Sequence, residues 1–324
     1  MIKMGNLMVI GVDCGNYNIK TASSCFVSGY KVVGKNSNFS DKLEYEGQYY
    51  ALSQQRLKMR LDKADPDFLI LLLFGIAKEL AKHAMPADVY EVALAVGLPP
   101  EHIGHMELKE NLRNYYQGEW LFAYNGTEYA IRVTKVFVCP QNFAGTMAYV
   151  ASDEMHTLKR PDIRRPYDIL RKEPESLLID IGGGTVDIVG LQNGTPIPEY
   201  HKSLPEGLIG LYKTVNDDMR SRTGDELSET AINSVLREEP SRISDDEKRL
   251  IQVHMRQYTE RLLLLLDEHR LPFRGSYNLV MGGGVPVVKK SWQAYEGFGK
   301  LDFLDDIRAN ARGYEEMALE ALVR

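Results

Sequence analysis

Two segments of the chain place acidic residues and glycines directly after an apolar stretch, where side chains and backbone amides could bind a charged ligand. The first segment, residues 9–22, reads VIGVDCGNYNIKTA and contributes the candidates Asp13, Gly15 and Lys20. The second segment, residues 177–190, reads LLIDIGGGTVDIVG and contributes the candidates Asp180, Gly182, Gly183, Gly184, Thr185 and Asp187. In both, an apolar strand leads to Asp-x-Gly, a short turn and a return strand, so the two halves of the chain carry a loose internal repeat.

Phosphate binding together with a divalent cation is the chemistry that suits these residue types. Glycines lack Cβ atoms, so successive backbone N–H groups can close on phosphate oxygens, and Thr185 can donate a further hydrogen bond. Carboxylates can hold the waters around Mg²⁺, which neutralises the β- and γ-phosphates. We therefore predict metal binding through water by Asp13 and Asp180, and a positive charge from Lys20. The alternative for Lys20 is a solvated strand position, and for Asp187 a hydrogen bond across the hairpin.

A third glycine cluster follows a predicted strand in the second half. Gly282, Gly283 and Gly284 come after the strand YNLVM and before a Val-Pro pair. Glycines at a strand end allow a flat adenosine group to approach the backbone closely. These three glycines, together with Gly207, complete the predicted nucleotide-binding set.

The hydrophobic pattern predicts the strands and helices that would position these segments. In the first half we expect strands at 7–15 and 16–27, short β pieces at 29–34 and 43–52, a strand within 90–100, and a hairpin over 119–140 that turns at Asn125-Gly126. Helices are expected at 66–83 with Asp65 as cap, at 105–118 and at 141–155. After a charged stretch at 158–176, we expect a hairpin at 177–194, helices at 207–222, 227–239 and 245–269, a strand at 277–281, and a strand or loop followed by a helix at 301–323.

Length and composition limit the classes of protein to which this sequence could belong. With 324 residues two domains are the default, and 44% hydrophobic residues are typical of a globular chain. The net charge of −6 argues against direct nucleic-acid binding, which needs a basic surface. Three widely spaced cysteines predict neither a disulfide framework nor a zinc ribbon. The apolar runs are too short to span a bilayer and the N-terminus lacks a signal-peptide pattern, so we expect a cytoplasmic location without membrane binding.

On these motifs the sequence resembles the actin/heat-shock-70/sugar-kinase ATPase superfamily, and most closely its ParM-type plasmid-segregation actins. The two phosphate hairpins of that superfamily match GVDCGNYNIK and LIDIGGGTVDIV, and its adenosine motif matches LVMGGGVPVV. The match to the first hairpin adds Asn16 and Asn18 to the predicted nucleotide-binding residues. Gln141 stands where the family places a water-polarising Gln or Glu. The segments around Gln141 and around Gly313 look like the two interdomain helices, and Cys14 and Cys139 fill apolar positions within the motifs.

The resemblance implies an α/β fold of the actin-like ATPase type. Two related domains, each with a central mixed sheet and helices, would flank a nucleotide cleft. Domain I would cover 1–158, with a small subdomain inserted at about 29–133 and the C-terminal helix at about 306–324, and domain II would cover 159–305. The helix over 227–239 would contact the base, with Arg237 as a candidate.

The function implied by the resemblance is slow hydrolysis of ATP or GTP that depends on Mg²⁺ and is coupled to polymerisation of the chain with itself into filaments. Gln141 and Asp180 are the catalytic candidates. An amide orients a water but is a poor base, and Asp180 would act through the water shell of the magnesium ion. The filament would segregate plasmid DNA through an adaptor protein bound to a centromere-like DNA site.

Two other functions on the same scaffold remain open at this point. A small-molecule kinase would need a carboxylate base on the substrate side, and phosphorylation of a sugar would favour it. A non-polymerising chaperone-like ATPase is expected to carry a linker and a substrate-binding domain after the ATPase, whereas this sequence ends at Arg324. An activator ATPase that carries a metal cluster is not expected, because it would need paired cysteines and the three cysteines of this sequence are widely spaced.

Overall fold

The structure, a computed structural model, describes residues 1–60, 62–148 and 169–324. The described residues form two compact units. Unit 1 contains the described residues up to Ile169 together with Ile307–Arg324, and unit 2 contains Leu170–Asp306. Each unit is built on its own mixed β-sheet.

Unit 1 is built on a ten-stranded sheet with a parallel centre. Its strands are β1 (Ile2–Met4), β2 (Leu7–Cys14), β3 (Asn18–Thr21), β4 (Cys25–Val27), β5 (Tyr30–Val33), β6 (Lys42–Tyr45), β7 (Gln48–Leu52), β8 (Tyr90–Leu98), β9 (Gly118–Tyr124) and β10 (Thr127–Pro140). The order across the sheet is β4-β3-β2-β8-β10-β9-β6-β7-β5, with β1 paired to β2. Strands β2, β8 and β10 are parallel neighbours, so their carboxyl ends lie at the same edge of the sheet.

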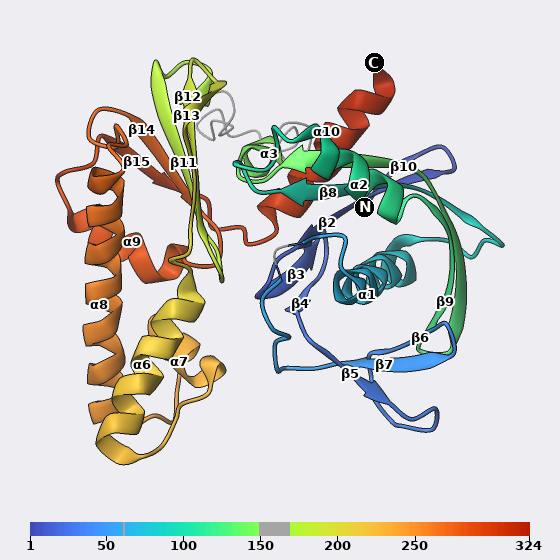
Figure 1. The fold of residues 1–324 in the computed structure, drawn as a ribbon, viewed down its shortest axis with the longest axis horizontal. Coiled ribbons are helices and arrows are strands. Elements are labelled where there is room, and N and C mark those ends of the chain that lie inside the picture. The colour runs from blue at the N-terminus through green and yellow to red at the C-terminus, as the bar shows by residue number, and fades with distance from the viewer. Residues whose placement is uncertain (61, 149–168) are drawn as a thin grey trace. The chain divides into compact units, whose positions relative to one another are not determined.

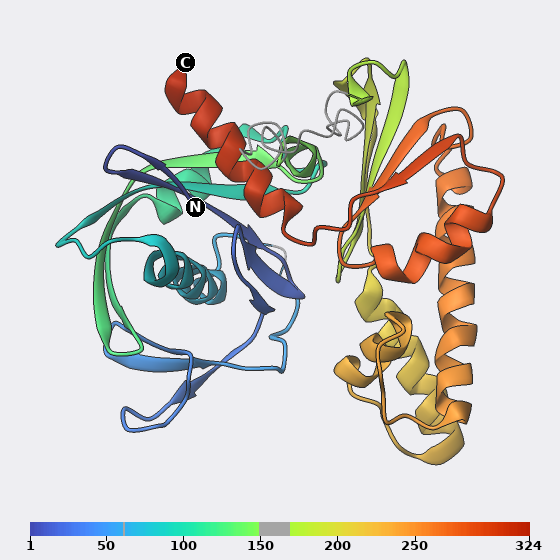
Figure 2. The same cartoon turned by 180° about the vertical axis from the view of Figure 1, so that it is seen from behind.

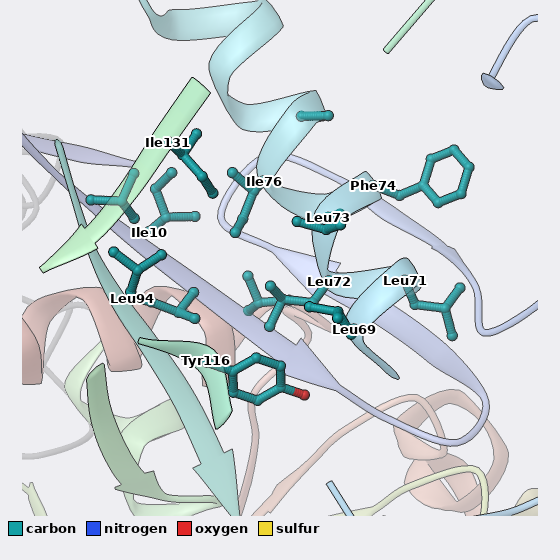
Figure 3. Packing of buried hydrophobic residues seen from close by; sticks show 14 of the residues in the cluster. Ile10, Leu69, Leu71, Leu72, Leu73, Phe74, Ile76, Leu94, Tyr116 and Ile131 are labelled. Atoms are coloured by element: carbon teal, nitrogen blue, oxygen red, sulfur yellow. The ribbon is translucent and has the colours of Figure 1, made fainter. Parts of the chain in front are cut away.

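Helix α1 (Pro66–His83) lies on the concave side of this curved sheet, as Figures 1 and 2 show from opposite sides. The helix begins as predicted, because the side chain of Asp65 accepts a hydrogen bond from the backbone N–H of Asp67 at 2.8 Å. Its apolar side chains pack against the three central strands and form the main core of unit 1. Figure 3 shows part of this core, including Leu69, Leu72, Leu73 and Ile76 of α1 and Ile10, Leu94 and Ile131 of the sheet.

Helix α10 (Ala309–Val323) packs on the opposite face of the same central strands. Side chains alternate along β2, since Ile10 and Val12 join the core around α1 while Val9 joins Tyr314 and Ala318 of α10 in a second cluster. Unit 1 is therefore a sheet with one helix layer on each face.

Glycine allows α10 to approach its neighbours closely at two points. A Cβ on Gly11 of β2 would lie 2.0 Å from the carbonyl oxygen of Ala311. A Cβ on Gly313 would lie 1.6 Å from the carbonyl oxygen of Ala144 in α3 (Phe143–Met147). Only glycine fits at either position, so α10 is held against both β2 and α3.

The remaining elements of unit 1 follow the sequence pattern. Helix α2 (Met106–Tyr116) precedes the hairpin of β9 and β10. This hairpin turns at Asn125-Gly126, where both residues have positive φ, 51° and 82°. The predicted hairpin turn is thereby confirmed.

Unit 2 is built on a five-stranded sheet in the order β13-β12-β11-β14-β15. Its strands are β11 (Glu175–Ile181), β12 (Val186–Gln192), β13 (Thr195–Leu204), β14 (Tyr277–Met281) and β15 (Lys300–Phe303). Strands β11, β14 and β15 are parallel, whereas β11, β12 and β13 form an antiparallel meander. The carboxyl ends of β11 and β14 therefore lie side by side.

Four helices of unit 2 group together in Figure 1: α6 (Leu208–Thr223), α7 (Glu229–Leu236), α8 (Asp245–Glu268) and α9 (Val285–Ala294). The long helix α8 contacts the other three. It starts with a capping box, in which Ser244 and Glu247 each bond the backbone N–H of the other. Its predicted extent is confirmed.

The structure differs from the sequence prediction at several elements. Strand β13 occupies a stretch where the chain was expected to run directly into helices, and its two prolines are tolerated because it lies at the edge of the sheet. Helix α9 begins directly after the third glycine cluster, where no helix was predicted. The single return strand expected at 16–27 is two strands, β3 and β4.

Other predictions extend past what the structure describes. The helix expected at 141–155 is described as α3 up to Met147, and the rest of it lies outside the described residues, as does most of the charged stretch at 158–176. Among the described helices, none combines the length and the apolar character that crossing a membrane requires.

Candidate functional site

Asp13 occupies the carboxyl edge of the unit 1 sheet, near the end of β2, and is only 3% exposed. Lys20 Nζ donates to Asp13 Oδ2 at 3.0 Å from the paired position on β3. Gln141 Nε2 donates to Asp13 Oδ1 at 3.1 Å. Gln141 reaches this edge because it follows β10, whose end is aligned with that of β2 through β8. The structure thus brings together a predicted acid, a predicted cation and the predicted catalytic amide.

The turn of the first hairpin is braced by its own side chains. The side chain of Asn16 exchanges two hydrogen bonds with the backbone of Arg60, each at 2.9 Å. A Cβ on Gly15 would lie 2.7 Å from the carbonyl oxygen of Asn18, so this turn requires glycine. In this structure Asn16 holds the chain around Arg60, and Asn18 is the first residue of β3, where it pairs with Val27 of β4.

The two cysteines of the predicted motifs are buried. Burial raises the pKa of the Cys14 thiol to about 12, and likewise that of the Cys139 thiol. Thiols with such pKa values are unreactive near neutral pH, as expected for cysteines that fill apolar positions.

The second hairpin carries the glycine loop of residues 182–185, between β11 and β12 in unit 2. The N–H of Gly182 donates to the carbonyl of Thr185 at 2.9 Å and closes the turn. Within the described parts of the chain, the next three amides, those of Gly183, Gly184 and Thr185, donate to no backbone carbonyl. Consecutive amides of this kind form a concave anion site.

The first turn of α6 holds this glycine loop in place. The N–H groups of Leu208 and Ile209 donate to the carbonyls of Gly182 and Gly183, at 3.1 Å and 2.9 Å. A Cβ on Gly207 would lie 2.4 Å from the carbonyl oxygen of Gly183. Gly207 therefore lets α6 approach the loop, and the helix supplies the partners of the loop carbonyls.

The carboxylate of Asp187 lies behind the glycine loop and is 7% exposed. One oxygen accepts a hydrogen bond from the hydroxyl of Thr185 at 2.9 Å, and the other accepts from the hydroxyl of Ser203 on β13. In this structure Asp187 braces the hairpin, and the Thr185 hydroxyl points to Asp187. A ligand contact for either side chain stays a prediction.

The third glycine cluster lies against the end of β11. Gly282 has φ 91° and a Cβ there would lie 2.1 Å from Asp180 Oδ1. The N–H of Gly284 donates to the carbonyl of Ile181 at 2.9 Å. The structure therefore places the third glycine cluster beside Asp180 and the glycine loop, at the carboxyl edge where α/β folds bind ligands.

Two further sequence predictions concern the base and the metal. The helix expected over 227–239 is α7, and Arg237, directly after it, is exposed. No group of three or more His, Cys, Asp or Glu side chains that could hold a metal ion occurs among residues 1–60, 62–148 and 169–324. Mg²⁺ needs no such cage, since it keeps several waters and binds through one or two carboxylates plus phosphate oxygens.

Comparison with solved structures shows the fold. The chain matches the apo pSK41 ParM protein over 98% of its own length and 99% of that chain, with a TM-score of 0.69 and 17% identity. It matches the archaeal actin homologue Ta0583 in complex with ADP over 96% and 99%, with a TM-score of 0.72 and 16% identity. It matches an Alp12 filament structure over 98% and 99%, with a TM-score of 0.65 and 15% identity.

The chain has the actin-like fold. In addition, residues 11–143 match the family model for the N-terminal domain of actin-like proteins. No curated protein sequence matches the chain significantly. The resemblance to ParM-type actins and the α/β fold class with mixed sheets are thereby confirmed.

Sequence reasoning missed two residues, Ser203 and Asn310, that hold parts of the candidate site in place. Ser203 was missed because β13 was not predicted, and no local pattern marks it as a partner of Asp187. Asn310, whose Oδ1 accepts from the backbone N–H of Asn142, lies 168 positions away from it. Contacts over such separations carry no signal in a single sequence.

Proposed function

We propose that this actin-like chain binds ATP or GTP with Mg²⁺, hydrolyses it slowly and assembles into filaments. One observation carries the proposal: the glycine loop presents three consecutive amides that have no backbone acceptor among the described residues, beside Gly282–Gly284, at the carboxyl edge of parallel strands. A solved neighbour with bound ADP and another in a filament support nucleotide binding and polymerisation.

The phosphates would be bound mainly by backbone atoms in unit 2. The amides of Gly183, Gly184 and Thr185 would donate to phosphate oxygens, and Gly282–Gly284 would lie against the nucleoside. The base itself would contact α7, with Arg237 as the candidate. Asp180 would hold metal-bound water. Mg²⁺, when bound, neutralises charge on the β- and γ-phosphates.

The first hairpin would supply the side-chain chemistry. Lys20, which is paired with Asp13 in the structure, would also interact with phosphate, and Asp13 would hold metal-bound water. Gln141 would orient the attacking water through its amide, a neutral group that is a weak base, and hydrolysis is therefore expected to be slow. In this proposal the first hairpin belongs to one actin-like domain, 1–158 with 306–324, and the second hairpin belongs to the other, 159–305.

The proposed cellular role is segregation of plasmid DNA in the cytoplasm. The neighbours that are ParM and Alp proteins support this role by resemblance. An adaptor protein on a centromere-like DNA site would join the filament to its cargo, since the net charge of −6 does not favour direct DNA binding.

Light scattering and pelleting of the purified chain test the proposal. Scattering should rise on addition of Mg²⁺ with ATP or GTP and fall again as nucleotide is hydrolysed, with no rise when EDTA is present. Asp180→Ala should abolish hydrolysis because the water shell of the metal is disturbed. Failure to assemble with either nucleotide at high protein concentration and varied salt would refute the filament, and normal hydrolysis by Asp180→Ala would refute the role of Asp180.

A further inference from the structure

The backbone turns sharply at Asn142, immediately after the proposed catalytic residue Gln141. Asn142 has φ 66° and ψ −63°, and the N–H of Phe143 donates to the carbonyl of Gln141 at 2.8 Å. These values define a γ-turn with positive φ, a conformation that is rare and strained for a residue other than glycine. Asn142 is fully buried, so the turn is enclosed by the protein.

Two hydrogen bonds fix the backbone on either side of this turn. The N–H of Gln141 donates to the carbonyl of Leu98 at the end of β8, at 3.0 Å. The N–H of Asn142 donates to Oδ1 of Asn310 at 3.0 Å, and Asn310 is itself buried at the start of α10. The strained turn is therefore anchored from the sheet and from α10.

The turn also determines where the Gln141 side chain can go. Its Nε2 donates to Asp13 Oδ1 at 3.1 Å. A Cβ on Gly97 would lie 2.9 Å from Gln141 Cγ and 1.9 Å from the hydroxyl oxygen of Tyr314 in α10. The Gln141 side chain therefore lies in a narrow space that exists only because residue 97 is glycine. A small change in the backbone at residue 142 would therefore displace the amide from Asp13.

We propose that Asn310 is a positioning residue for hydrolysis: it holds the Asn142 turn, and through that turn it aims the Gln141 amide. The proposal rests on the proposed role of Gln141. Asn310 lies in the first turn of α10, three residues after Ile307, where the chain returns to unit 1 from unit 2. Hydrolysis thus depends on the geometry at the start of α10 as well as on the nucleotide.

Asn310→Leu and Asn310→Asp form the matched pair that tests the proposal. Leucine has a similar size but no acceptor, whereas aspartate keeps an acceptor oxygen for the Asn142 amide. Asn310→Leu should lower kcat for ATP about 10²-fold with KM changed less than about twofold, because only the alignment of Gln141 is lost. Asn310→Asp should retain kcat within about threefold, since the acceptor is kept.

A second measurement shows whether Asn310 acts through Gln141. In a Gln141→Ala background, Asn310→Leu should lower kcat no further, because its effect has already been removed. An equal additional loss in that background would overturn the proposal, as would unchanged turnover in Asn310→Leu alone. Unchanged melting curves identify the variants that have kept their fold.

A third measurement needs no hydrolysis at all. Hydrogen exchange at the Asn142 amide should be slow in the parent chain and in Asn310→Asp, and fast in Asn310→Leu. Asn142→Gly, which accommodates positive φ, should keep the Gln141 geometry and lose less turnover than Asn142→Ala. Unchanged exchange in Asn310→Leu would overturn the positioning role, whereas absent hydrolysis by the parent chain would refute only the proposed enzymatic function.

Discussion

The two hairpins that begin the repeated halves differ in the atoms that make the contacts at their turns. In the first, side chains dominate: Asp13 is bonded to Lys20 and Gln141, and Asn16 is bonded to the Arg60 backbone. In the second, backbone atoms dominate, since the glycine loop offers amides and binds the start of α6 through its carbonyls. The same strand–turn–strand pattern therefore presents side chains in unit 1 and backbone amides in unit 2, and the proposed function gives each hairpin a different task.

The largest effect should come from a substitution in the third glycine cluster, which lies beside the second hairpin. Gly282→Ala places a methyl group 2.1 Å from Asp180 Oδ1 and requires a left-handed conformation at φ 91°. We expect loss of nucleotide binding and destabilisation of about 2–4 kcal/mol. The matched control is Gly210→Ala in α6, an exposed position outside the proposed nucleotide-binding set, since a Cβ at Gly210 meets nothing within 4 Å. Thermal melts and titration with a fluorescent ATP analogue measure both effects, and equal behaviour of the two variants would contradict this account.

The first hairpin should be sensitive to charge instead. Lys20→Met leaves the carboxylate of Asp13, 3% exposed, without its cation. We expect a loss of about 3 kcal/mol in the free energy of unfolding, because a buried charge loses its partner. Lys20→Arg, which keeps the charge, is the control and should lose less. Denaturant titration of the two variants measures the difference, and a Lys20→Met chain as stable as the parent would show that the pair contributes nothing.

A buried carboxyl beside β2, the strand that leads into the first hairpin, should also make the stability of unit 1 depend on pH. Glu315 of α10, which accepts a hydrogen bond from the N–H of Gly11 at 3.0 Å, is buried, and burial raises the pKa of its carboxyl to about 7 although the nearby Met1 ammonium lowers it. A raised carboxyl pKa adds stability below the usual value of 4.5, and this contribution is lost as pH rises through about 7. The loss amounts to at most about 3 kcal/mol.

Glu315→Gln should therefore reduce the fall in stability between pH 5 and pH 8, measured as the change in melting temperature across that range. Glu320→Gln, on an exposed position of the same helix, is the control and should follow the parent chain. An identical pH profile for Glu315→Gln and the parent would contradict the raised pKa.

The smallest effect should come from the hydrogen bonds that the Asp187 carboxylate accepts behind the glycine loop. Thr185→Val removes the hydroxyl that donates to Asp187 but keeps the Thr185 backbone amide. We expect a loss of about 1 kcal/mol in stability and less than about a tenfold loss in ATP affinity. Ser203→Ala removes a second hydroxyl that donates to Asp187, and this variant should show losses of the same size. A loss of affinity as large as that of Gly282→Ala would mean that the Thr185 hydroxyl contacts the nucleotide directly.

The actin-like fold could be predicted through the resemblance that three motifs carry, and the two glycine-containing hairpins could be predicted because their signals are local. Apolar strands followed by Asp-x-Gly, the Asn125-Gly126 turn and the Asp65 cap each depend on neighbouring residues. Strand β13 was not predicted because its prolines argue against a strand unless its position at the sheet edge is known. Helix α9 was not predicted although a proline at the start of a helix is a recognised signal. The contacts of Asp13 with Gln141 and of Asn142 with Asn310 depend on how distant strands and helices pack, and no local pattern encodes them.

Hydrogen exchange at the glycine loop tests the central claim most directly, because it observes the amides that are proposed to bind phosphate. In the chain without nucleotide, the amides of Gly183, Gly184 and Thr185 should exchange rapidly, since they donate to no backbone carbonyl in the described structure. Saturating Mg²⁺ and ATP should slow their exchange at least about tenfold, and Gly282→Ala should abolish this protection. Nucleotide binding that leaves these three amides as fast as before would contradict the account.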